Sequence, residues 1–247
     1  MNDKNIEQNN NINTNQKNVN NSVSVAIVIA GIVIAGAIIF TSKNPAPINT
    51  TVKEKDIVSK LATSLKIDEV ELRNCVDNNV FADKVQGDQE DAVANGAQGT
   101  PFFVITDNNG NKYIGGGAMP YLDPEDLGRG LKDMLDDILN KTAKSQTLSG
   151  PKAISDDDYV LGNPDAPLTF YIYDDLVCPY CQRFNSETKK MMADYGQQGK
   201  IKMVFRHFPL DGLHPEARLK AEAVECAGKI GGEEKFWQGV DFMFENQ

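Results

Sequence analysis

Short apolar runs bounded by turn residues mark the strands expected along this chain. Residues 101–106 (Pro-Phe-Phe-Val-Ile-Thr) are typical of a strand, residues 107–110 (Asp-Asn-Asn-Gly) of a hairpin turn, and residues 112–115 of the returning strand. Two further apolar runs, at residues 168–173 and 200–206, carry the β-branched and aromatic side chains that strands favour. The pattern therefore predicts four strands.

Apolar residues at helical spacing separate these strands. One helix is expected from about residue 56, and Asp68 is placed to cap the N-terminus of the next. Another helix begins at Pro124, one follows the cysteine pair at residues 178–181, and one begins near Pro215. The last apolar segment is residues 236–244. The expected apolar faces of the helices near residues 68, 124 and 215 are, in that order, Leu72, Cys75, Val76 and Val80; Leu127, Leu131, Met134, Leu135 and Ile138; and Leu219, Ala223, Cys226 and Ala227. Strands interleaved with helices predict an α/β domain.

The start of the chain differs from the rest in composition. Residues 1–21 hold ten asparagines and few apolar side chains, so we expect a disordered tail. Residues 22–40 are uncharged and mostly apolar, and a membrane-spanning helix needs about 20 such residues. A cleaved signal peptide is the rival interpretation, but the run starts late and no Ala-x-Ala-like site follows Phe40. We expect one uncleaved transmembrane helix at residues 22–40, a linker at residues 41–55 and one folded domain at residues 56–247.

Charge limits the partners of this domain. The net charge of −10 argues against nucleic acid and against an anionic lipid surface. The lysines beside the apolar run do not decide its orientation, since they lie on both sides of it: Lys4, Lys17, Lys43, Lys53 and Lys55. Low but even cysteine usage suits an oxidising compartment. We therefore expect the tail inside the cell and the domain outside the membrane.

The most specific chemical feature is the run Cys178-Pro179-Tyr180-Cys181, which follows a predicted strand and opens a predicted helix. The N-terminus of a helix carries partial positive charge and free N–H groups, which favour a thiolate over a thiol. A thiolate is the species that attacks a disulfide. The spacing therefore indicates a redox-active dithiol.

Two structural interpretations of the cysteine pair are weaker. A tetrahedral zinc site needs two more ligands at suitable spacing, whereas the remaining candidates stand alone in the sequence: Cys75, Cys226, His207 and His214. A purely structural disulfide across two intervening residues closes a loop too short to stabilise the fold much. We expect no metal.

Several motifs together resemble the DsbA-like thiol–disulfide oxidoreductases. They are Gly162-Asn-Pro-Asp-Ala-Pro167, Asp175-Leu-Val-Cys178-Pro-Tyr-Cys181, Phe205-Arg-His-Phe-Pro209, His214-Pro215, Ala221-Glu-Ala-Val-Glu-Cys-Ala-Gly228, Lys235-Phe-Trp237 and Phe244-Glu-Asn-Gln247. The second half of the family pattern is similar to an upstream stretch: Leu72-Arg-Asn-Cys75, Gly99-Thr-Pro-Phe-Phe103 and Gly117-Ala-Met-Pro-Tyr121. The resemblance implies a thioredoxin-like fold with a helical insertion, disulfide exchange with exported proteins, a quinone-linked membrane reoxidant and no organic cofactor.

The two parts of this resemblance occur in inverted order. Residues 56–140 (the upstream piece) are similar to the second half of the family pattern and residues 161–247 (the downstream piece) to the first half, with residues 141–160 as a polar connector. A circular permutation explains this order, since exposed loops tolerate such breaks and about 20 extended residues span up to ~70 Å. The alternatives are half-domains that swap between two chains, and a fragment of a tandem array or a gene-assembly error.

The resemblance also assigns roles within the cysteine pair. Cys178 is expected to be the exposed nucleophile and Cys181 the resolving thiol, with Pro179 and Tyr180 setting the stability of the thiolate. Some family members have His at the position of Tyr180, and Tyr supplies no positive charge. We therefore expect a moderately lowered Cys178 pKa and a less extreme oxidant.

Outside the pair, Thr100 and Pro101 match the family's Thr–cis-Pro loop, which lies against the dithiol and pairs with extended substrate. Without the resemblance, Pro101 is more simply the start of a strand. Family members often carry a buried Glu six residues before the first cysteine, where this chain has Ile172. Asp175 or a water is a candidate substitute, although Asp175 is equally placed as an ordinary strand-end residue. The missing Glu argues against fast turnover.

Cys75 and Cys226 fall in the helical region of the family pattern, where some members have a second disulfide. We predict a structural bridge between them, with two buried free thiols as the alternative. His207 and His214 are expected to be packing or surface residues. The leading function is a membrane-anchored, extracytoplasmic thiol–disulfide oxidoreductase. The rival is a redox-inactive peptide-binding or chaperone module with the same fold.

Overall fold

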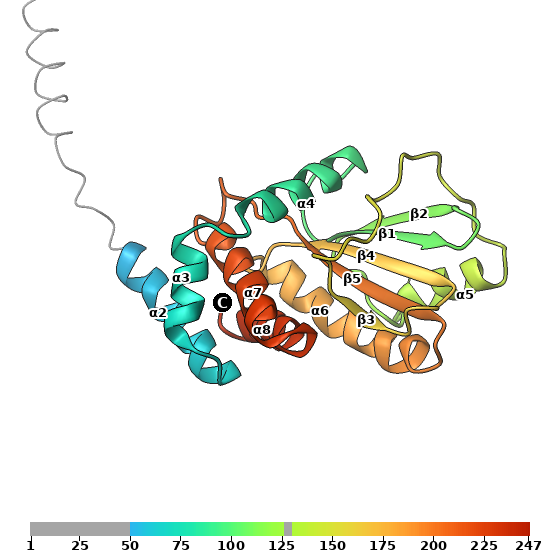
Figure 1. Cartoon of the computed structure of the whole chain (residues 1–247). Coiled ribbons are helices and arrows are strands. Elements are labelled where there is room, and N and C mark those ends of the chain that lie inside the picture. Colours follow the sequence, from blue (N-terminus) through green and yellow to red (C-terminus); the bar gives the residue numbers. More distant parts are fainter. Residues whose placement is uncertain (1–49, 126–129) are drawn as a thin grey trace, which may run out of the picture. The chain divides into compact units, whose positions relative to one another are not determined.

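A five-stranded sheet runs through the folded part of the chain (Figure 1). The structure is a computed structural model that describes residues 50–125 and 130–247. The elements in chain order are α2 (Thr50–Leu65), α3 (Glu69–Asp77), α4 (Ala82–Ala94), β1 (Phe102–Asp107), β2 (Lys112–Gly116), α5 (Leu131–Leu139), β3 (Val160–Gly162), β4 (Leu168–Asp174), α6 (Pro179–Met191), the π-helix η1 (Met192–Gly196), β5 (Ile201–His207), α7 (Ala217–Gly231) and α8 (Glu233–Glu245).

The predicted tail and transmembrane helix lie outside the described residues. Within residues 50–125 and 130–247, no helix combines the length and the apolar character needed to span a membrane. The predicted linker reaches too far, because α2 already begins at Thr50 and the folded unit begins at Thr51.

The sheet joins the two pieces of the chain directly. Its strand order is β2-β1-β4-β5-β3, with β4 parallel to β5 and the other neighbours antiparallel. The upstream strand β1 pairs with the downstream strand β4 along its whole length, from Phe102 opposite Tyr173 to Asp107 opposite Leu168. The green and yellow strands of Figure 1 therefore lie side by side although they are distant in sequence.

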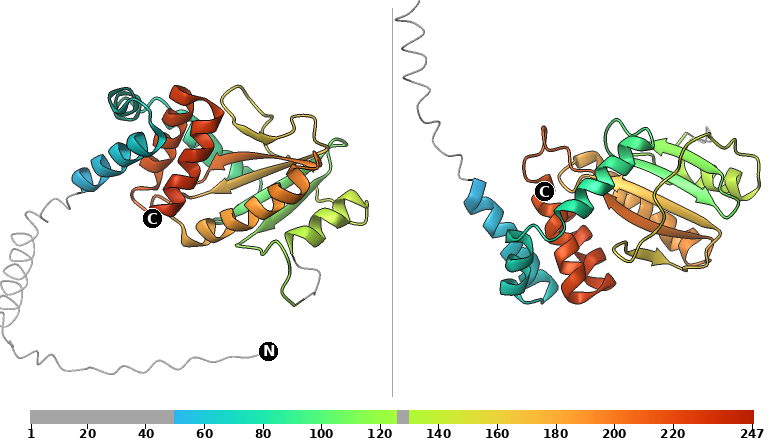
Figure 2. Two further views of the ribbon diagram at one scale, coloured as in Figure 1. Left: turned by 90° about the horizontal axis from the view of Figure 1, so that it is seen from below. Right: turned by 45° about the horizontal axis from the view of Figure 1, so that its top comes forward.

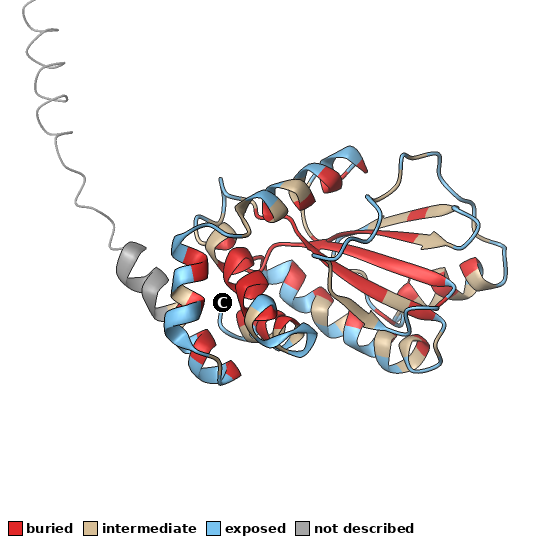
Figure 3. Ribbon diagram, viewed as in Figure 1, coloured by how far each residue is buried: buried red, intermediate tan, exposed pale blue. Residues whose placement is uncertain are grey.

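Side chains of the central strand β4 alternate between two apolar layers. Phe170 and Ile172 point into the layer covered by α5 and α6, while Tyr171 and Tyr173 point into the layer covered by α4. Figure 2 shows α6 lying across one face of the sheet and α4 across the other. Every residue of β4 is buried, as the red colour of this strand shows (Figure 3). A strand that is buried on both faces needs an almost unbroken apolar run, and this run is what located β4 in the sequence.

A helical layer of α2, α3, α7 and α8 packs at the end of the sheet where α6 begins (Figure 1). A disulfide between Cys75 of α3 and Cys226 of α7 lies within this layer, with an S–S distance of 1.99 Å and a Cα–Cα distance of 5.9 Å. One of these cysteines belongs to the upstream piece and the other to the downstream piece. The bridge therefore links the two pieces covalently.

Local signals predicted some boundaries and missed others. Asp68 caps α3 as predicted, accepting a hydrogen bond from the Glu71 N–H at 2.8 Å. The helix predicted from Pro124 instead begins at Leu131, where the Asp133 carboxylate accepts the N–H of the preceding Gly130. Helix α3 ends at Asp77, so the predicted core residue Val80 lies beyond it and is exposed; Leu127 lies outside the described residues.

Candidate active site

The cysteine pair lies at the junction of β4 and α6. Strand β4 ends at Asp174, the backbone turns through the next three residues, and Cys178 occupies the N-cap position of α6 with Pro179 in the first turn. Proline suits this position because its missing N–H has no helical partner there. The turn therefore presents Cys178 to the free N–H groups at the helix N-terminus.

The sheet register brings Thr100 and Pro101 to the same place. Because Phe102 pairs with Tyr173 in antiparallel β1–β4, the residues just before β1 lie beside the residues just after β4. The Thr100–Pro101 peptide bond is cis, and the Thr100 carbonyl oxygen lies 3.9 Å from the Cys178 Sγ. The structure thus assembles the dithiol and the loop expected to face it from opposite pieces of the chain.

The two sulfurs have opposite electrostatic environments. Hydrogen bonding from the Cys181 thiol lowers the pKa of Cys178 to about 5, with further help from the Cys181 and Tyr180 backbone and the Thr100 side chain. Burial, together with the hydrogen bond to the Cys178 sulfur, raises the pKa of Cys181. At neutral pH the pair therefore holds a thiolate on Cys178 and a thiol on Cys181.

We expect the reduced protein to show a thiolate titration near pH 5, well below the ordinary thiol range. The thiolate absorbance of the reduced chain should fall with a midpoint near this pH, because the Cys178 pKa lies there. The signal should be lost in Cys178→Ser and retained, with a higher midpoint, in Cys181→Ala, which lacks the donor thiol. A midpoint in the ordinary range for the parent protein would contradict the prediction.

Cys178 is less accessible than the sequence suggested. We expected an exposed nucleophile, but only 5% of Cys178 is exposed, and Cys181 is fully buried. The Thr100 carbonyl covers the sulfur on one side, and the Gln247 side-chain amide lies 3.2 Å from the Cys178 backbone oxygen. Tyr180 is instead the exposed member of the run, at 59%.

A buried carboxyl beside the dithiol was not predicted. Asp174 is 1% exposed, and among the described residues no donor lies at hydrogen-bond distance from either of its oxygens. Burial raises its pKa well above the usual range, and its charge in turn raises the pKa of Cys181. Side chains two residues apart on a strand share a face, so Asp174 lies on the same face as Ile172, where the family's Glu is missing. The alternation of faces along the strand, counted from Ile172, is the sequence signal that would have located Asp174.

Asp175, one of the two candidate substitutes for the missing Glu, points elsewhere. Its carboxylate accepts hydrogen bonds from the backbone N–H groups of Val177 and Leu210 and contacts the His214 ring. It therefore organises the turn instead of meeting the Cys181 sulfur.

Replacing Asp174 with Asn is expected to stabilise the protein above about pH 4. Because the Asp174 pKa is raised, the folded state keeps a proton that the unfolded state loses above its own pKa, so the free energy of unfolding falls as pH rises. Asn has no such proton, so the gain should be absent near pH 3 and reach at least about 1 kcal/mol by pH 7. Urea unfolding of reduced parent and variant at several pH values measures it; a gain independent of pH would contradict the argument.

The remaining predicted residues lie away from the dithiol. Cys75 and Cys226 are joined to each other, and His207 is fully buried with its Nε2 3.0 Å from Glu225 Oε1. His214 contacts Asp175 beside the turn. Among residues 50–125 and 130–247, no three His, Cys, Asp or Glu side chains are grouped so that they could hold a metal ion.

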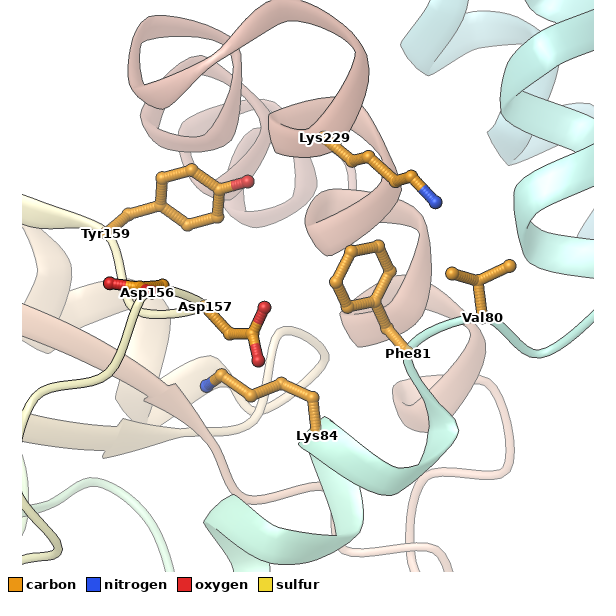
Figure 4. A pocket seen from close by; sticks show the side chains of 7 residues that line it. All are labelled: Val80, Phe81, Lys84, Asp156, Asp157, Tyr159 and Lys229. Atoms are coloured by element: carbon orange, nitrogen blue, oxygen red, sulfur yellow. The ribbon is translucent and has the colours of Figure 1, made fainter.

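A cavity of about 380 Å³ lies between the start of α4, the connector and α7 (Figure 4). In Figure 4 the Lys229 side chain extends over the Phe81 ring, and Asp157 points toward Lys84 across the opening. The lining residues are Val80, Phe81, Lys84, Asp156, Asp157, Tyr159 and Lys229. None of them belongs to the dithiol site.

Comparison with known proteins agrees with this geometry. Residues 155–247 match the profile of the thioredoxin family. Disulfide bond formation protein D of Bacillus subtilis (strain 168) is 34% identical over 110 residues, which cover 44% of this chain and 48% of that protein. The domain has a thioredoxin-like α/β fold. The predicted resemblance is confirmed as a likeness over the matched part of the chain, while the inverted order of the two pieces stays a prediction.

Two other similarities cover comparable parts of the chain. Na(+)/H(+) antiporter NhaA 1 of Salinispora arenicola (strain CNS-205) is 37% identical over 92 residues, covering 37% of this chain and 13% of that protein. The crystal structure of Pseudomonas aeruginosa DsbA2 is 32% identical, with a TM-score of 0.33, over 36% of this chain and 48% of that chain. The chain spans less than half the length of the curated relatives it matches here.

Proposed function

We propose that this chain is a membrane-anchored, extracytoplasmic thiol–disulfide oxidoreductase that acts on exported proteins. The observation that carries the proposal is the asymmetry of the dithiol, with a lowered pKa at Cys178 and a raised pKa at Cys181. A stabilised Cys178 thiolate is a good leaving group, which favours passing the disulfide on to a substrate. Thr100 and Pro101 beside the sulfur offer backbone against which an extended substrate can lie.

The exchange proceeds through a mixed disulfide on Cys178. A substrate thiolate attacks the Cys178 Sγ of the oxidised pair, the Cys178–Cys181 bond breaks, and Cys181 leaves and takes up a proton, for which Asp174 is the adjacent acid. A second substrate thiolate attacks the substrate sulfur, and Cys178 leaves as a thiolate. The substrate loses two electrons and gains a disulfide, and the domain gains those electrons as a dithiol. A membrane reoxidant of the quinone-linked type then removes them.

A stoichiometric exchange assay tests this function. The oxidised full chain is mixed with a reduced two-cysteine peptide, and both thiol contents are counted by alkylation and mass measurement. We expect one peptide disulfide to form for each Cys178–Cys181 disulfide lost. A redox-inactive peptide-binding module would retain the peptide and leave both thiol counts unchanged, which would overturn the proposal.

We also propose that the inverted pieces close on each other within one chain, as a circular permutation requires. Support comes from the β1–β4 pairing and from the Cys75–Cys226 bridge between the pieces. Cleaving the connector at residues 141–160 should yield two fragments that stay together on a non-reducing gel and separate after reduction. A disulfide-linked dimer of uncut chains would instead indicate swapped half-domains, and two free thiols at Cys75 and Cys226 would favour a fragment or an assembly error.

Membrane fractionation and protease digestion test the proposed membrane anchor at residues 22–40. The full chain should sediment with membranes and resist extraction by carbonate, whereas a variant that begins at residue 50 should not. Protease added outside intact cells should digest the domain if it faces outward. Protection of the domain from that protease would overturn the proposed location.

A further inference from the structure

A buried carboxylate ties the dithiol turn to a separate loop. The Asp175 side chain has no exposed surface. Its Oδ1 accepts the Val177 N–H at 2.7 Å, and its Oδ2 accepts the Leu210 N–H at 2.8 Å and lies 2.8 Å from Nδ1 of His214. The Asp175 backbone carbonyl also accepts the Cys178 N–H at 3.1 Å. One residue thus fixes the backbone leading into Cys178 and links it to the loop before α7.

The His214 ring is not needed to form that loop. The His214 N–H already donates to the Leu210 carbonyl at 2.8 Å, and the His214 carbonyl accepts the Ala217 N–H at 3.0 Å. A second link holds the same loop to α4, where the Gln89 side chain donates to the Pro209 carbonyl at 2.8 Å. The imidazole therefore adds a contact to backbone that is already ordered, and the partner of that contact is the Asp175 carboxylate.

We infer that His214 is a positioning residue for the dithiol, acting through Asp175. Its Nδ1–H holds the Asp175 carboxylate in the orientation that receives the Val177 N–H, and so keeps Cys178 at the N-terminus of α6. A buried carboxylate is costly unless its oxygens are hydrogen-bonded, so losing one donor frees it to reorient toward water. This inference rests on the proposed function, since it assigns His214 a part in setting the reactivity of the Cys178 sulfur.

The expected consequence is a less stable Cys178 thiolate. When the turn loosens, the N–H groups at the start of α6 no longer lie in one fixed geometry around the sulfur. The reduced form is then less favoured relative to the disulfide. We expect the dithiol–disulfide equilibrium constant to change about tenfold, which for this two-electron couple is about 30 mV toward a more negative potential.

Three variants of the full chain test the inference: His214→Ala, His214→Asn and Arg218→Ala. The readouts are the reduction potential against glutathione and the pH midpoint of the Cys178 thiolate absorbance. His214→Ala should show the tenfold shift and a higher midpoint. His214→Asn should stay within about twofold of the parent, because its side-chain amide places an N–H donor where Nδ1–H was. Arg218→Ala is the matched control, since Arg218 pairs with Asp211 on the same loop at 2.7 Å.

The results that would overturn the role of His214 differ from the result that would overturn the proposed function. A potential for His214→Ala within about twofold of the parent overturns the inference, and so does an Asn variant as altered as the Ala variant. A shift in Arg218→Ala equal to that of His214→Ala also overturns it, because any loosening of the loop would then suffice. If the parent chain itself exchanges no disulfide, the proposed function fails instead, whatever the His214 variants do.

Discussion

Changing Cys178 to Ser is expected to abolish disulfide exchange, while changing Cys181 to Ser is expected to trap the substrate. The Cys178 sulfur is the one with the lowered pKa, and it faces the Thr100–Pro101 loop. Cys181 is fully buried with a raised pKa, so it serves only to resolve what forms on its neighbour. Without Cys181, a disulfide between Cys178 and a substrate that carries one cysteine has no second thiol, in the domain or in the substrate, to release it.

The measurement is the peptide exchange assay together with non-reducing mass analysis. Cys178→Ser should give no peptide disulfide and no adduct above background. Cys181→Ser, first converted to a mixed disulfide with a small reagent, should exchange that reagent for a peptide that carries a single cysteine and should hold it as a stable one-to-one adduct that reductant removes. Lys190→Ala serves as the control, because it leaves both sulfurs in place and changes an exposed side chain that pairs with Glu187. Adducts on Cys181 in the Cys178→Ser variant would show that the roles of the two sulfurs are reversed.

The sequence pattern was sufficient to predict those elements whose buried side chains are apolar. Strands β1 and β4 were predicted because their buried residues form continuous apolar runs, and α3 because Asp68 provides a cap. Helix α4 was missed. Its buried side includes Asp88 and Asp91, so the apolar periodicity that marks an amphipathic helix is weak there.

Parts of the candidate site could likewise be predicted from the sequence, and other parts could not. The positions of Cys178 and Thr100 could be inferred from motifs, but the covering of Cys178 depends on segments that close over it only in the fold. The distinction between Asp174 and Asp175 required knowing where β4 ends and which face each residue takes. Alternation of faces counted from Ile172 distinguishes Asp174 from Asp175, but only once the strand is known to continue to residue 174.

Replacing Arg206 with Met is expected to destabilise the domain by about 3–5 kcal/mol, as measured by urea unfolding. The guanidinium is 3% exposed and pairs with Asp91 of α4 at 2.6 Å and with Asp158 of the connector at 2.9 Å. It also donates to the backbone carbonyls of Lys152 and Ala153. One side chain on β5 therefore binds the upstream piece and the connector at once, and its loss leaves two buried carboxylates without their main partner.

Lowering the pH should reduce the difference in free energy of unfolding between the parent and Arg206→Met. Burial alone would raise the Asp158 pKa, but the hydrogen bonds from Arg206 lower it below its usual value. That stabilising contribution is present above about pH 4 and is lost as pH falls through the lowered pKa, so the gap should shrink in this range. Arg218→Met is the matched control, because its ion pair with Asp211 is exposed and should change stability by less than about 1 kcal/mol.

The same variant also tests what completes the dithiol site. Helix α4 precedes the Thr100–Pro101 loop, so weakening its attachment to β5 should loosen that loop from the Cys178 sulfur. In Arg206→Met the thiolate midpoint should then rise at urea concentrations where the parent is unaffected, before the whole domain unfolds. If the variant unfolds at the same urea concentration as the parent, the two pieces are held together by the apolar layers and the disulfide alone, and the buried ion pairs contribute only to the shape of the connector.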